Sequence, residues 1–324
     1  MSIPILKVLN PGLFSTIQDL GRVKFRCYGI TTSGAMDDFA LRVGNRLVGN
    51  QQDEAGIELT FVGGEYLIMQ DCIISITGGN LNPQVEGKNV PTWESLFLRK
   101  DSKLSFENFG KGVRSYLCIQ GGIDVPLILD SKSTDIKVGF GGYEGRKLKP
   151  GDTIYKKDDN LDVNYVDDYF SPNLINKYYS WDLSVVQIRV LLGPELDYFS
   201  GKGINTFLNS DYIISEKADR MGYQLDGPKI EHSKKGPNII TNATPTGAIQ
   251  VPEKGTPIIL LRDNQTTGGY PKIATVITPD ISVLAQRSSW DKINFIKVDT
   301  EEAYRLYRQR EYFINLTPLS KIKM

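Results

Sequence analysis

The chain has 324 residues with a hydrophobic fraction of 40%, an ordinary globular composition at a length beyond which a single core stops growing. Its 38 basic and 38 acidic residues balance, so no overall field favours nucleic acid or an anionic membrane surface as a partner. No apolar run approaches a membrane span, and the first residues lack the apolar stretch of a signal peptide. We therefore expect two lobes in a cytoplasmic protein.

Most of the chain predicts short β-strands. Segments of four to eight residues, rich in β-branched and aromatic side chains, alternate with Gly, Asn, Asp and Pro. This spacing is typical of barrels or sandwiches and not of βαβ units. The predicted strands include residues 65–70, 72–79, 95–100, 103–109, 115–122, 153–157, 185–193, 223–227, 257–261, 273–277 and 293–298.

Two helices interrupt the strands, at 36–48 and 301–313. The first has acids at its start, Arg46 near its end and Gly49 after it. Residues 156–182 lose all sustained periodicity and gather acids, Asn and Tyr, so we interpret them as a connection. The predicted division is a β lobe over 1–157, a connecting segment over 158–184 and a second β lobe over 185–324.

Several familiar catalytic sites are excluded by what the sequence lacks. Cys27, Cys72 and Cys118 are far apart in apolar surroundings, which favours buried reduced thiols over disulfides or a metal site. The single histidine, His232, leaves little from which to build a Ser-His-Asp triad or a zinc centre. No P-loop and no dinucleotide-binding glycine pattern occurs. We expect no metal.

Two polar constellations lie in the N-terminal half. Residues 16–22, TIQDLGR, are followed by residues 31–37, TTSGAMD, where amides at a helix N-terminus and nearby hydroxyls suit a carboxylate or phosphate. The alternative is that Ser33 or a neighbouring hydroxyl caps the helix. Residues 131–135, SKSTD, precede a glycine loop at 139–145, and a pair of tight turns is the alternative there.

Two further constellations lie in the C-terminal half. In residues 218–223, ADRMGY, the pair Asp219–Arg220 can hold a carboxylate or amide through the guanidinium fork, or be a surface ion pair. Residues 261–272, LRDNQTTGGYPK, lie between two apolar runs. There paired glycines allow a ligand close to the backbone, Tyr270 offers a ring and a hydroxyl, and Lys272 offers a cation. The alternative is a generic hairpin.

Nine motifs in order carry a family resemblance over residues 5–298: TIQDLGR, SGAMD, GGIDVP, STD with GGYEGR, GPELDYF, DRMGYQLDGP, GAIQVP, QTTGGYPKIATVI and LAQ. The sequence resembles the carboxyltransferase family that includes allophanate hydrolase subunit 2, the carboxyltransferase part of urea carboxylase, the KipA proteins and the C subunit of the ATP-dependent 5-oxoprolinase.

The resemblance implies two cyclophilin-like β-barrel lobes and a KipI-type partner, equivalent to a B-type subunit, in a heterodimer or heterotetramer. For 5-oxoprolinase it adds an A-type subunit and ATP, at a site on this chain or on a partner, to open 5-oxoproline to glutamate. A free-standing chain favours this branch. The alternatives are carboxyl transfer from biotin held on another chain, because no Met-Lys-Met motif occurs here, and a KipA-like regulator that binds a kinase inhibitor.

The lactam reaction needs a carboxylate anchor, donors for an oxyanion and an oriented water. Our hypotheses are that Arg22 or Arg220 anchors the carboxylate. Lys272 with the Gly268 and Gly269 amides stabilises the oxyanion or phosphate. Further catalytic candidates, for orienting water, are Asp19, Asp219 and Gln265. Further substrate-binding candidates are Ser33, Gly34, Ser133, Thr134, Thr266, Thr267 and Tyr270. Two positions depart from the family pattern, which commonly has Ser at Ala218 and Arg at Lys132.

Overall fold

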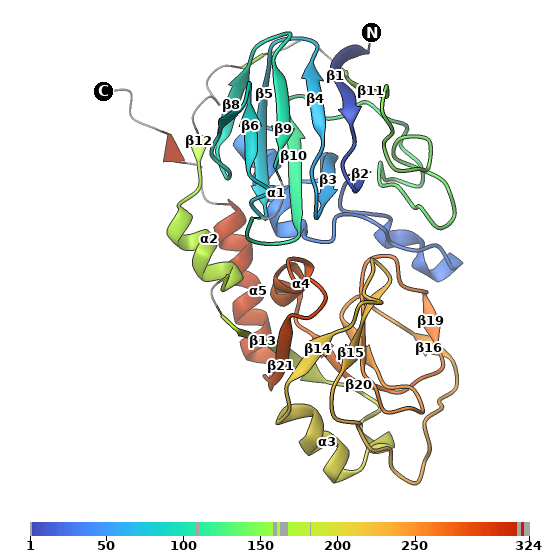
Figure 1. The fold of residues 1–324 in the computed structure, drawn as a ribbon. Coiled ribbons are helices and arrows are strands. Elements are labelled where there is room, and N and C mark those ends of the chain that lie inside the picture. The colour runs from blue at the N-terminus through green and yellow to red at the C-terminus, as the bar shows by residue number, and fades with distance from the viewer. Residues whose placement is uncertain are drawn as a thin grey trace. The chain divides into compact units, whose positions relative to one another are not determined.

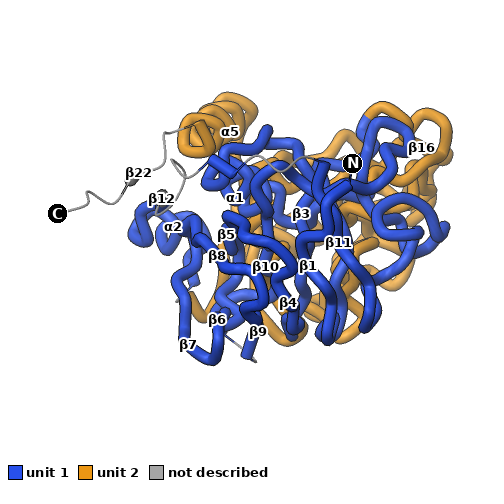
Figure 2. Tube along the Cα trace, turned by 90° about the horizontal axis from the view of Figure 1, so that it is seen from above, with its two compact units in different colours: residues 1–23, 33–181, 316–324 blue, residues 24–32, 182–315 orange. Residues whose placement is uncertain are grey.

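The computed structural model describes residues 2–107, 110–157, 161–162, 168–181, 183–315 and 319–320 (Figure 1). The chain forms two compact units (Figure 2). Unit 1 comprises residues 1–23, 33–181 and 316–324, and unit 2 comprises residues 24–32 and 182–315. The sequence-based division differs at residues 24–32, which cluster with unit 2, and at residues 168–181 and 319–320, which cluster with unit 1. Parts of the predicted connecting segment, 158–160, 163–167 and 182, lie outside the described residues.

Unit 1 is built from two antiparallel sheets and a two-stranded ladder. The larger sheet runs in the order β11 (Thr153–Lys156), β1 (Ile3–Asn10), β4 (Glu65–Ile68), β9 (Lys103–Phe106), β6 (Pro83–Val85) and β7 (Lys88–Asn89). The smaller sheet runs β2 (Phe14–Gln18), β3 (Gly56–Thr60), β10 (Arg114–Ile119), β5 (Cys72–Gly78) and β8 (Ser95–Leu98). The ladder pairs β12 (Asp168–Tyr169) with β22 (Leu319–Ser320), and α2 spans Pro172–Tyr179.

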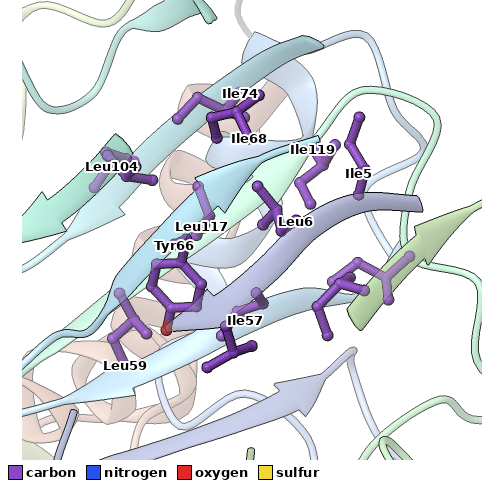
Figure 3. Close-up of a cluster of buried hydrophobic side chains, with 14 of the residues drawn as sticks. Ile5, Leu6, Ile57, Leu59, Tyr66, Ile68, Ile74, Leu104, Leu117 and Ile119 are labelled. Atoms are coloured by element: carbon purple, nitrogen blue, oxygen red, sulfur yellow. The ribbon is translucent and has the colours of Figure 1, made fainter. Parts of the chain in front are cut away.

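The two sheets of unit 1 share one hydrophobic core (Figure 3). In the larger sheet, β4 and β9 alternate buried with less buried residues, which is the pattern of a sheet with one covered face. In the smaller sheet, β3, β5 and β10 are buried along their whole length. The core side chains labelled in Figure 3 are Ile5, Leu6, Ile57, Leu59, Tyr66, Ile68, Ile74, Leu104, Leu117 and Ile119.

Helix α1 (Asp38–Leu47) packs on β5 and β10, which explains why these strands have no exposed face. A Cβ atom at Gly44 would lie 2.8 Å from Thr77 Oγ1 and 2.9 Å from Cys118 Sγ, so only glycine allows this close approach. The N-cap is Asp37, whose carboxylate accepts a hydrogen bond from the Ala40 amide at 3.0 Å. The alternative that Ser33 or a neighbouring hydroxyl caps this helix is therefore wrong.

Unit 2 is a closed β-barrel. Its strand order is β13 (Val185–Leu192), β20 (Lys272–Val276), β17 (Ala248–Gln250), β18 (Ile258–Leu260), β15 (Gly222–Asp226), β14 (Tyr212–Ile214) and β21 (Lys292–Lys297). Strands β13 and β21 close the barrel as a parallel pair. A separate two-stranded sheet pairs β16 (Asn242–Ala243) with β19 (Thr267–Gly268).

Short helices complete unit 2. They are the 3-10 helix η3 (Leu196–Tyr198), α3 (Gly201–Leu208), α4 (Thr278–Ala285) and α5 (Thr300–Asn315), while the 3-10 helix η1 (Val23–Tyr28) begins in unit 1. The predicted mainly β fold with a few short helices is confirmed, and both predicted helices occur, as α1 and α5. Within the described part of the chain, none of the helices combines the length and the apolar run needed to cross a bilayer.

The three cysteines are free, but the expectation that all are buried is wrong for Cys27. It lies on η1, in which no residue is buried. Cys72 and Cys118 are buried, and burial raises the pKa of each thiol to about 12.

We expect one fast-reacting thiol in the folded protein. Because the thiolate is the nucleophile, a raised pKa leaves Cys72 and Cys118 almost entirely protonated at about pH 8. An aromatic disulfide reagent should label Cys27 rapidly and the other two only after denaturation, as followed by absorbance. Cys27→Ser should remove the fast phase. Three fast thiols in the folded wild-type chain would contradict the burial of Cys72 and Cys118.

Candidate functional site

The candidate residues fall into two groups, one in each unit. In unit 1 the two N-terminal constellations meet at the carboxylate of Asp19. Asp19 Oδ1 accepts hydrogen bonds from Gly21 N and Ser131 Oγ, both at 2.7 Å, and from Ser133 Oγ, while Oδ2 accepts one from Lys132 N at 2.6 Å. The Asp19 amide donates back to Ser133 Oγ at 3.0 Å. Four hydrogen bonds thus fix this carboxylate and tie the end of β2 to residues 131–133.

Arg22 and Thr134 are buried in the same junction. Arg22 Nε donates to Ile128 O at 3.1 Å, Nη2 donates to Ser133 O, and the guanidinium lies over the Phe140 ring at 4.5 Å. Thr134 Oγ1 donates to Ile17 O at 3.0 Å. These contacts give both side chains a role in packing the loops together.

Ser33 and Gly34 lie beside the same loop with strained backbone. Both have positive φ, 53° and 89°, and a Cβ at Gly34 would come within 2.9 Å of Gly21 N. The Gly34 amide donates to Gln18 Oε1 at 3.1 Å. The Ser33 hydroxyl is buried and has no hydrogen-bond partner among the described residues. A buried orphan hydroxyl on strained backbone is typical of a functional position.

A pocket of about 310 Å³ opens at this junction. Lys132 pairs with Glu54 in its wall, and the Lys132 ammonium also donates to Ile123 O at 2.8 Å. Of the charged residues that line the pocket, four are acidic and one is basic, so the pocket has an excess of negative charge. It is lined by Asp19, Leu20, Gly21, Asp53, Glu54, Leu127, Asp130 and Lys132.

In unit 2 the third and fourth constellations meet through an ion pair. Arg220 Nε lies 2.8 Å from Asp263 Oδ2 and Nη2 lies 3.1 Å from Oδ1, with both side chains largely buried. One edge of the guanidinium fork therefore already holds a carboxylate. Asp219 is exposed, and its Oδ1 accepts hydrogen bonds from Met221 N at 2.7 Å and Gly222 N at 3.2 Å. Asp219 thus closes a turn.

Lys272 is buried beside Glu195. Its Nζ lies 3.0 Å from Glu195 Oε1, its amide donates to Glu195 Oε2 at 3.3 Å, and its side chain is 5% exposed. The ammonium nevertheless makes no hydrogen bond of good geometry within the described part of the chain. Gly193, from the same GPELDYF motif as Glu195, must be glycine because a Cβ there would lie 2.1 Å from Lys272 O. Lys272 is thus a charge-paired cation whose N–H donors remain to be satisfied.

Residues 238–244 and 265–270 form a ribbon around the β16–β19 pair, and we call it the ribbon. The Ile239 amide donates to Gly269 O at 2.9 Å and the Thr244 amide to Thr266 O at 3.1 Å. Gln250 Nε2 donates to Tyr270 O at 3.2 Å. A Cβ atom at Gly268 would come within 2.6 Å of the same nitrogen, so a larger residue at Gly268 would clash with Gln250. The ribbon thus carries the candidates Gln265, Thr266, Thr267, Gly268, Gly269 and Tyr270, and Tyr270 is 41% exposed.

Arg26, which the sequence did not single out, holds residues 24–32 to the base of the ribbon. Its Nη2 donates to Thr244 O at 2.7 Å and Gln265 O at 3.2 Å, and its Nη1 donates to Asn264 Oδ1 at 3.3 Å. Burial lowers the pKa of Arg26. No sequence pattern in residues 24–32 predicts these contacts of Arg26.

Glu195, Gln250 and Asn264 were also missed as site residues. All three stand inside motifs that the sequence does show, GPELDYF, GAIQVP and the polar loop, so the motifs themselves were the signal. Two positions depart from the family pattern. Lys132, at the first, pairs with Glu54, and nothing in the structure explains Ala218 at the second. Among the described residues, no group of three or more His, Cys, Asp or Glu side chains is placed to hold a metal ion.

The chain belongs to the carboxyltransferase domain family, subdomain A and B, whose model matches residues 28–297. It is similar to the C subunit of 5-oxoprolinase from Escherichia coli, with 35% identity over 96% of this chain and 97% of that protein. The corresponding figures for the C subunit of 5-oxoprolinase from Haemophilus influenzae are 34%, 96% and 97%. Urea amidolyase of Saccharomyces cerevisiae is 28% identical over 98% of this chain but only 18% of its own length.

Solved structures show the same fold. The chain matches urea carboxylase of Kluyveromyces lactis with a TM-score of 0.88 and 27% identity, over 97% of this chain and 29% of that one. Urea amidolyase of K. lactis gives a TM-score of 0.87 and 27% identity, over 97% and 20%. The chain therefore spans less than a third of either of these longer proteins.

Replacing Arg26 with Ala should release residues 24–32 from unit 2. Hydrogen bonds to a charged donor contribute about 1.5–3 kcal/mol each, so chymotryptic cleavage at Phe25 or Tyr28 should become at least about tenfold faster. Arg26→Lys keeps the charge without the fork and should lie between wild type and Ala. Arg99→Ala, at an exposed position, is the control, and an unchanged cleavage rate for Arg26→Ala would refute the anchoring role.

Proposed function

We propose that this chain is a subunit of an ATP-dependent 5-oxoprolinase that opens 5-oxoproline to glutamate together with A-type and B-type partner subunits. The observation that carries the proposal is the match to two 5-oxoprolinase C subunits over 97% of their length. The alignment leaves almost nothing of these two proteins unmatched.

The proposed reaction activates an amide that water alone opens slowly. The γ-phosphoryl group of ATP is transferred to the lactam oxygen and ADP leaves. Water then attacks the activated carbon and the ring C–N bond breaks, so that the nitrogen becomes the amine of glutamate and the carbon is left as an acyl phosphate. A second water hydrolyses this acyl phosphate to the carboxylate and releases phosphate. Negative charge develops on oxygen in these steps, and fixed donors in a dry site stabilise it most effectively.

Lys272 is the residue we propose for that stabilisation. It is buried, it is held by Glu195, and its donors lack hydrogen bonds within the described part of the chain, so a developing oxyanion would complete its coordination. The exposed ring of Tyr270 and the paired glycines before it would let substrate approach along the ribbon. We do not assign the carboxylate anchor to Arg22 or Arg220, because both guanidinium groups are already engaged by acceptors of the chain.

The phosphates of ATP would fit poorly in the pocket of unit 1. Its lining is acidic, and the Lys132 ammonium is already paired with Glu54 and bonded to Ile123 O. A triphosphate would be repelled there. We therefore propose that a partner subunit holds the nucleotide.

Asp19 could orient a water only through its Oδ2 atom. Oδ1 already accepts three hydrogen bonds from the chain, whereas Oδ2 accepts one.

A second candidate function is carboxyl transfer from carboxybiotin carried on another chain. The match of the carboxyltransferase family model and the TM-score of 0.88 to urea carboxylase favour it. The ribbon and Lys272 would then face a carboxylated ring nitrogen instead of a lactam. This alternative leaves the fold and the residues unchanged and differs only in the substrate.

The function is tested by reconstitution. We expect the purified chain, mixed with the A-type and B-type proteins from the same genome, to release glutamate from 5-oxoproline only when ATP is present, measured by a coupled glutamate assay. Omitting this chain is the control. A stable complex of all three that releases no glutamate, or that transfers carboxylate from biotin, would refute the proposal.

Replacing Lys272 with Ala should lower kcat of the complex by at least about two orders of magnitude, the scale of losing one oxyanion donor. Because a lone Glu195 would remain buried at a cost of about 3–5 kcal/mol, the double variant Lys272→Gln with Glu195→Gln removes both charges together. Lys254→Ala, at an exposed position, is the control. Near-normal turnover by a folded double variant would remove Lys272 from the mechanism.

A further inference from the structure

Unit 1 has a second pocket, of about 220 Å³, beside helix α2 (Figure 1). An apolar cavity of about 150 Å³ is enough to hold benzene, so this pocket admits a ring system larger than one six-membered ring. Two of the three tryptophans of the chain, Trp93 and Trp181, line it. Among the described residues, it shares no lining residue with the acidic pocket at Asp19. We call it the tryptophan pocket.

The loop that carries Trp93 holds this residue in an unusual backbone conformation. Its φ is 62°, a value that bulky residues rarely adopt. Two backbone hydrogen bonds hold it there: Trp93 N donates to Ile76 O at 2.7 Å, and Trp93 O accepts from Phe170 N at 3.0 Å. The indole is fixed as well, because its Nε1 donates to Gly78 O at 3.1 Å. Backbone strain that the surrounding structure maintains in this way clusters at ligand sites.

The ring of Tyr179 joins the two tryptophans. Its centroid lies 4.6 Å from that of the Trp181 ring, in a stacked arrangement, and 5.9 Å from that of the Trp93 ring. Tyr179 is fully buried, and its hydroxyl donates to Asp37 Oδ2 at 2.7 Å. Because Asp37 caps α1, these contacts tie the aromatic side of the pocket to that helix. The tryptophan pocket therefore has a preformed aromatic side, as ligand sites usually do.

The rest of the lining is polar and nearly uncharged. Its polar side chains are those of Asn80, Thr92, Lys111 and Asn176. Lys111 is the one charged residue among the described lining residues, and it already interacts with another group of the chain. Asn80 Oδ1 accepts a hydrogen bond from Asn82 N at 2.9 Å. The exposed side-chain amide of Asn176 makes no hydrogen bond within the described part of the chain, so it can offer both a donor and an acceptor to a ligand.

We propose that the tryptophan pocket binds an adenine base. Bases stack on aromatic side chains, and Trp181 and Trp93 supply ring surface for this. An Asn amide pairs with adenine through two hydrogen bonds, accepting one from N6 and donating one to N7, and we assign this contact to Asn176.

The ligand is recognised by its base alone. Because Lys111 is already engaged, we assign no phosphate contact to the pocket. A free nucleoside and a nucleotide would therefore bind alike. The proposal does not depend on the reaction proposed above, and the ATP that the reaction consumes would stay on the partner subunit.

The proposal is tested by tryptophan fluorescence of the full-length chain carrying Trp290→Phe, which leaves only the two tryptophans of the pocket. Adenosine should quench this emission saturably, because a stacked base contacts the indole. AMP and ATP should bind about as tightly as adenosine, with little dependence on salt. Inosine, which has an acceptor where adenosine has the N6 donor, should bind at least about fivefold more weakly.

Two variants, measured by calorimetry, separate stacking from pairing. Trp181→Ala should weaken adenosine binding at least about fivefold, the scale of losing one base–aromatic stack. Asn176→Ala should weaken adenosine binding and remove the preference over inosine. Asn176 is exposed, so the melting temperature of this variant should stay near that of wild type. Asn173→Ala, at an exposed position on the same helix outside the pocket lining, is the matched control.

Several results would overturn the proposal. They are the absence of saturable quenching by adenosine, equal binding of adenosine and inosine by the wild type, and unchanged adenosine binding by Trp181→Ala and Asn176→Ala. Binding of ATP that is much tighter than that of adenosine and is lost at high salt would indicate phosphate recognition, and would also overturn it. Displacement of adenosine by 5-oxoproline at equal concentration would assign the pocket to the substrate instead. A complex that releases no glutamate would refute the proposed function and leave the adenine site standing.

Discussion

The carboxylate of Asp19 organises unit 1. It accepts four hydrogen bonds, three of them from residues more than a hundred positions away, and so joins the end of β2 to the loop after β10. Without it the hydroxyls of Ser131 and Ser133 and the Lys132 amide would be buried without acceptors, each at a cost of about 1–3 kcal/mol. The pocket and the position of Arg22 both follow from this junction. A carboxylate that looked catalytic in the sequence thus first serves to build the site.

In unit 2, too, acceptors of the chain fix the polar side chains that looked catalytic in the sequence. Glu195 fixes Lys272, Asp263 fixes Arg220 and the carbonyls at the base of the ribbon fix Arg26. These pairs place cations from distant parts of the chain within one unit without leaving a buried charge alone, which would cost several kcal/mol. Lys272 differs from the other two because its charge is balanced while its donors are not bonded within the described residues. That difference is why it is the residue to which we assign chemistry.

The sequence predicted the β class, helices α1 and α5 and the four polar constellations, but not α2, α3 and α4. It could not predict which charged residues pair, because Glu195 lies 77 positions from Lys272 and Asp263 lies 43 from Arg220. Local patterns therefore suggested Arg22 and Asp219 as ligand contacts. In the structure the Arg22 guanidinium stacks on Phe140, and the Asp219 carboxylate accepts a hydrogen bond from Met221 N within a turn. They also assigned residues 24–32 to the first lobe, because the contacts of Arg26 that hold them to unit 2 are made more than two hundred positions away.

The candidate arginine of each unit is already engaged by the chain's own acceptors, which raises the question of what binds an anionic substrate. Both candidate carboxylate anchors are occupied, and the pocket of unit 1 is acidic. Lys272 supplies one cation, which is too little for 5-oxoproline and a triphosphate together. Under the proposed function, the partner subunit that holds the nucleotide would supply the further cations.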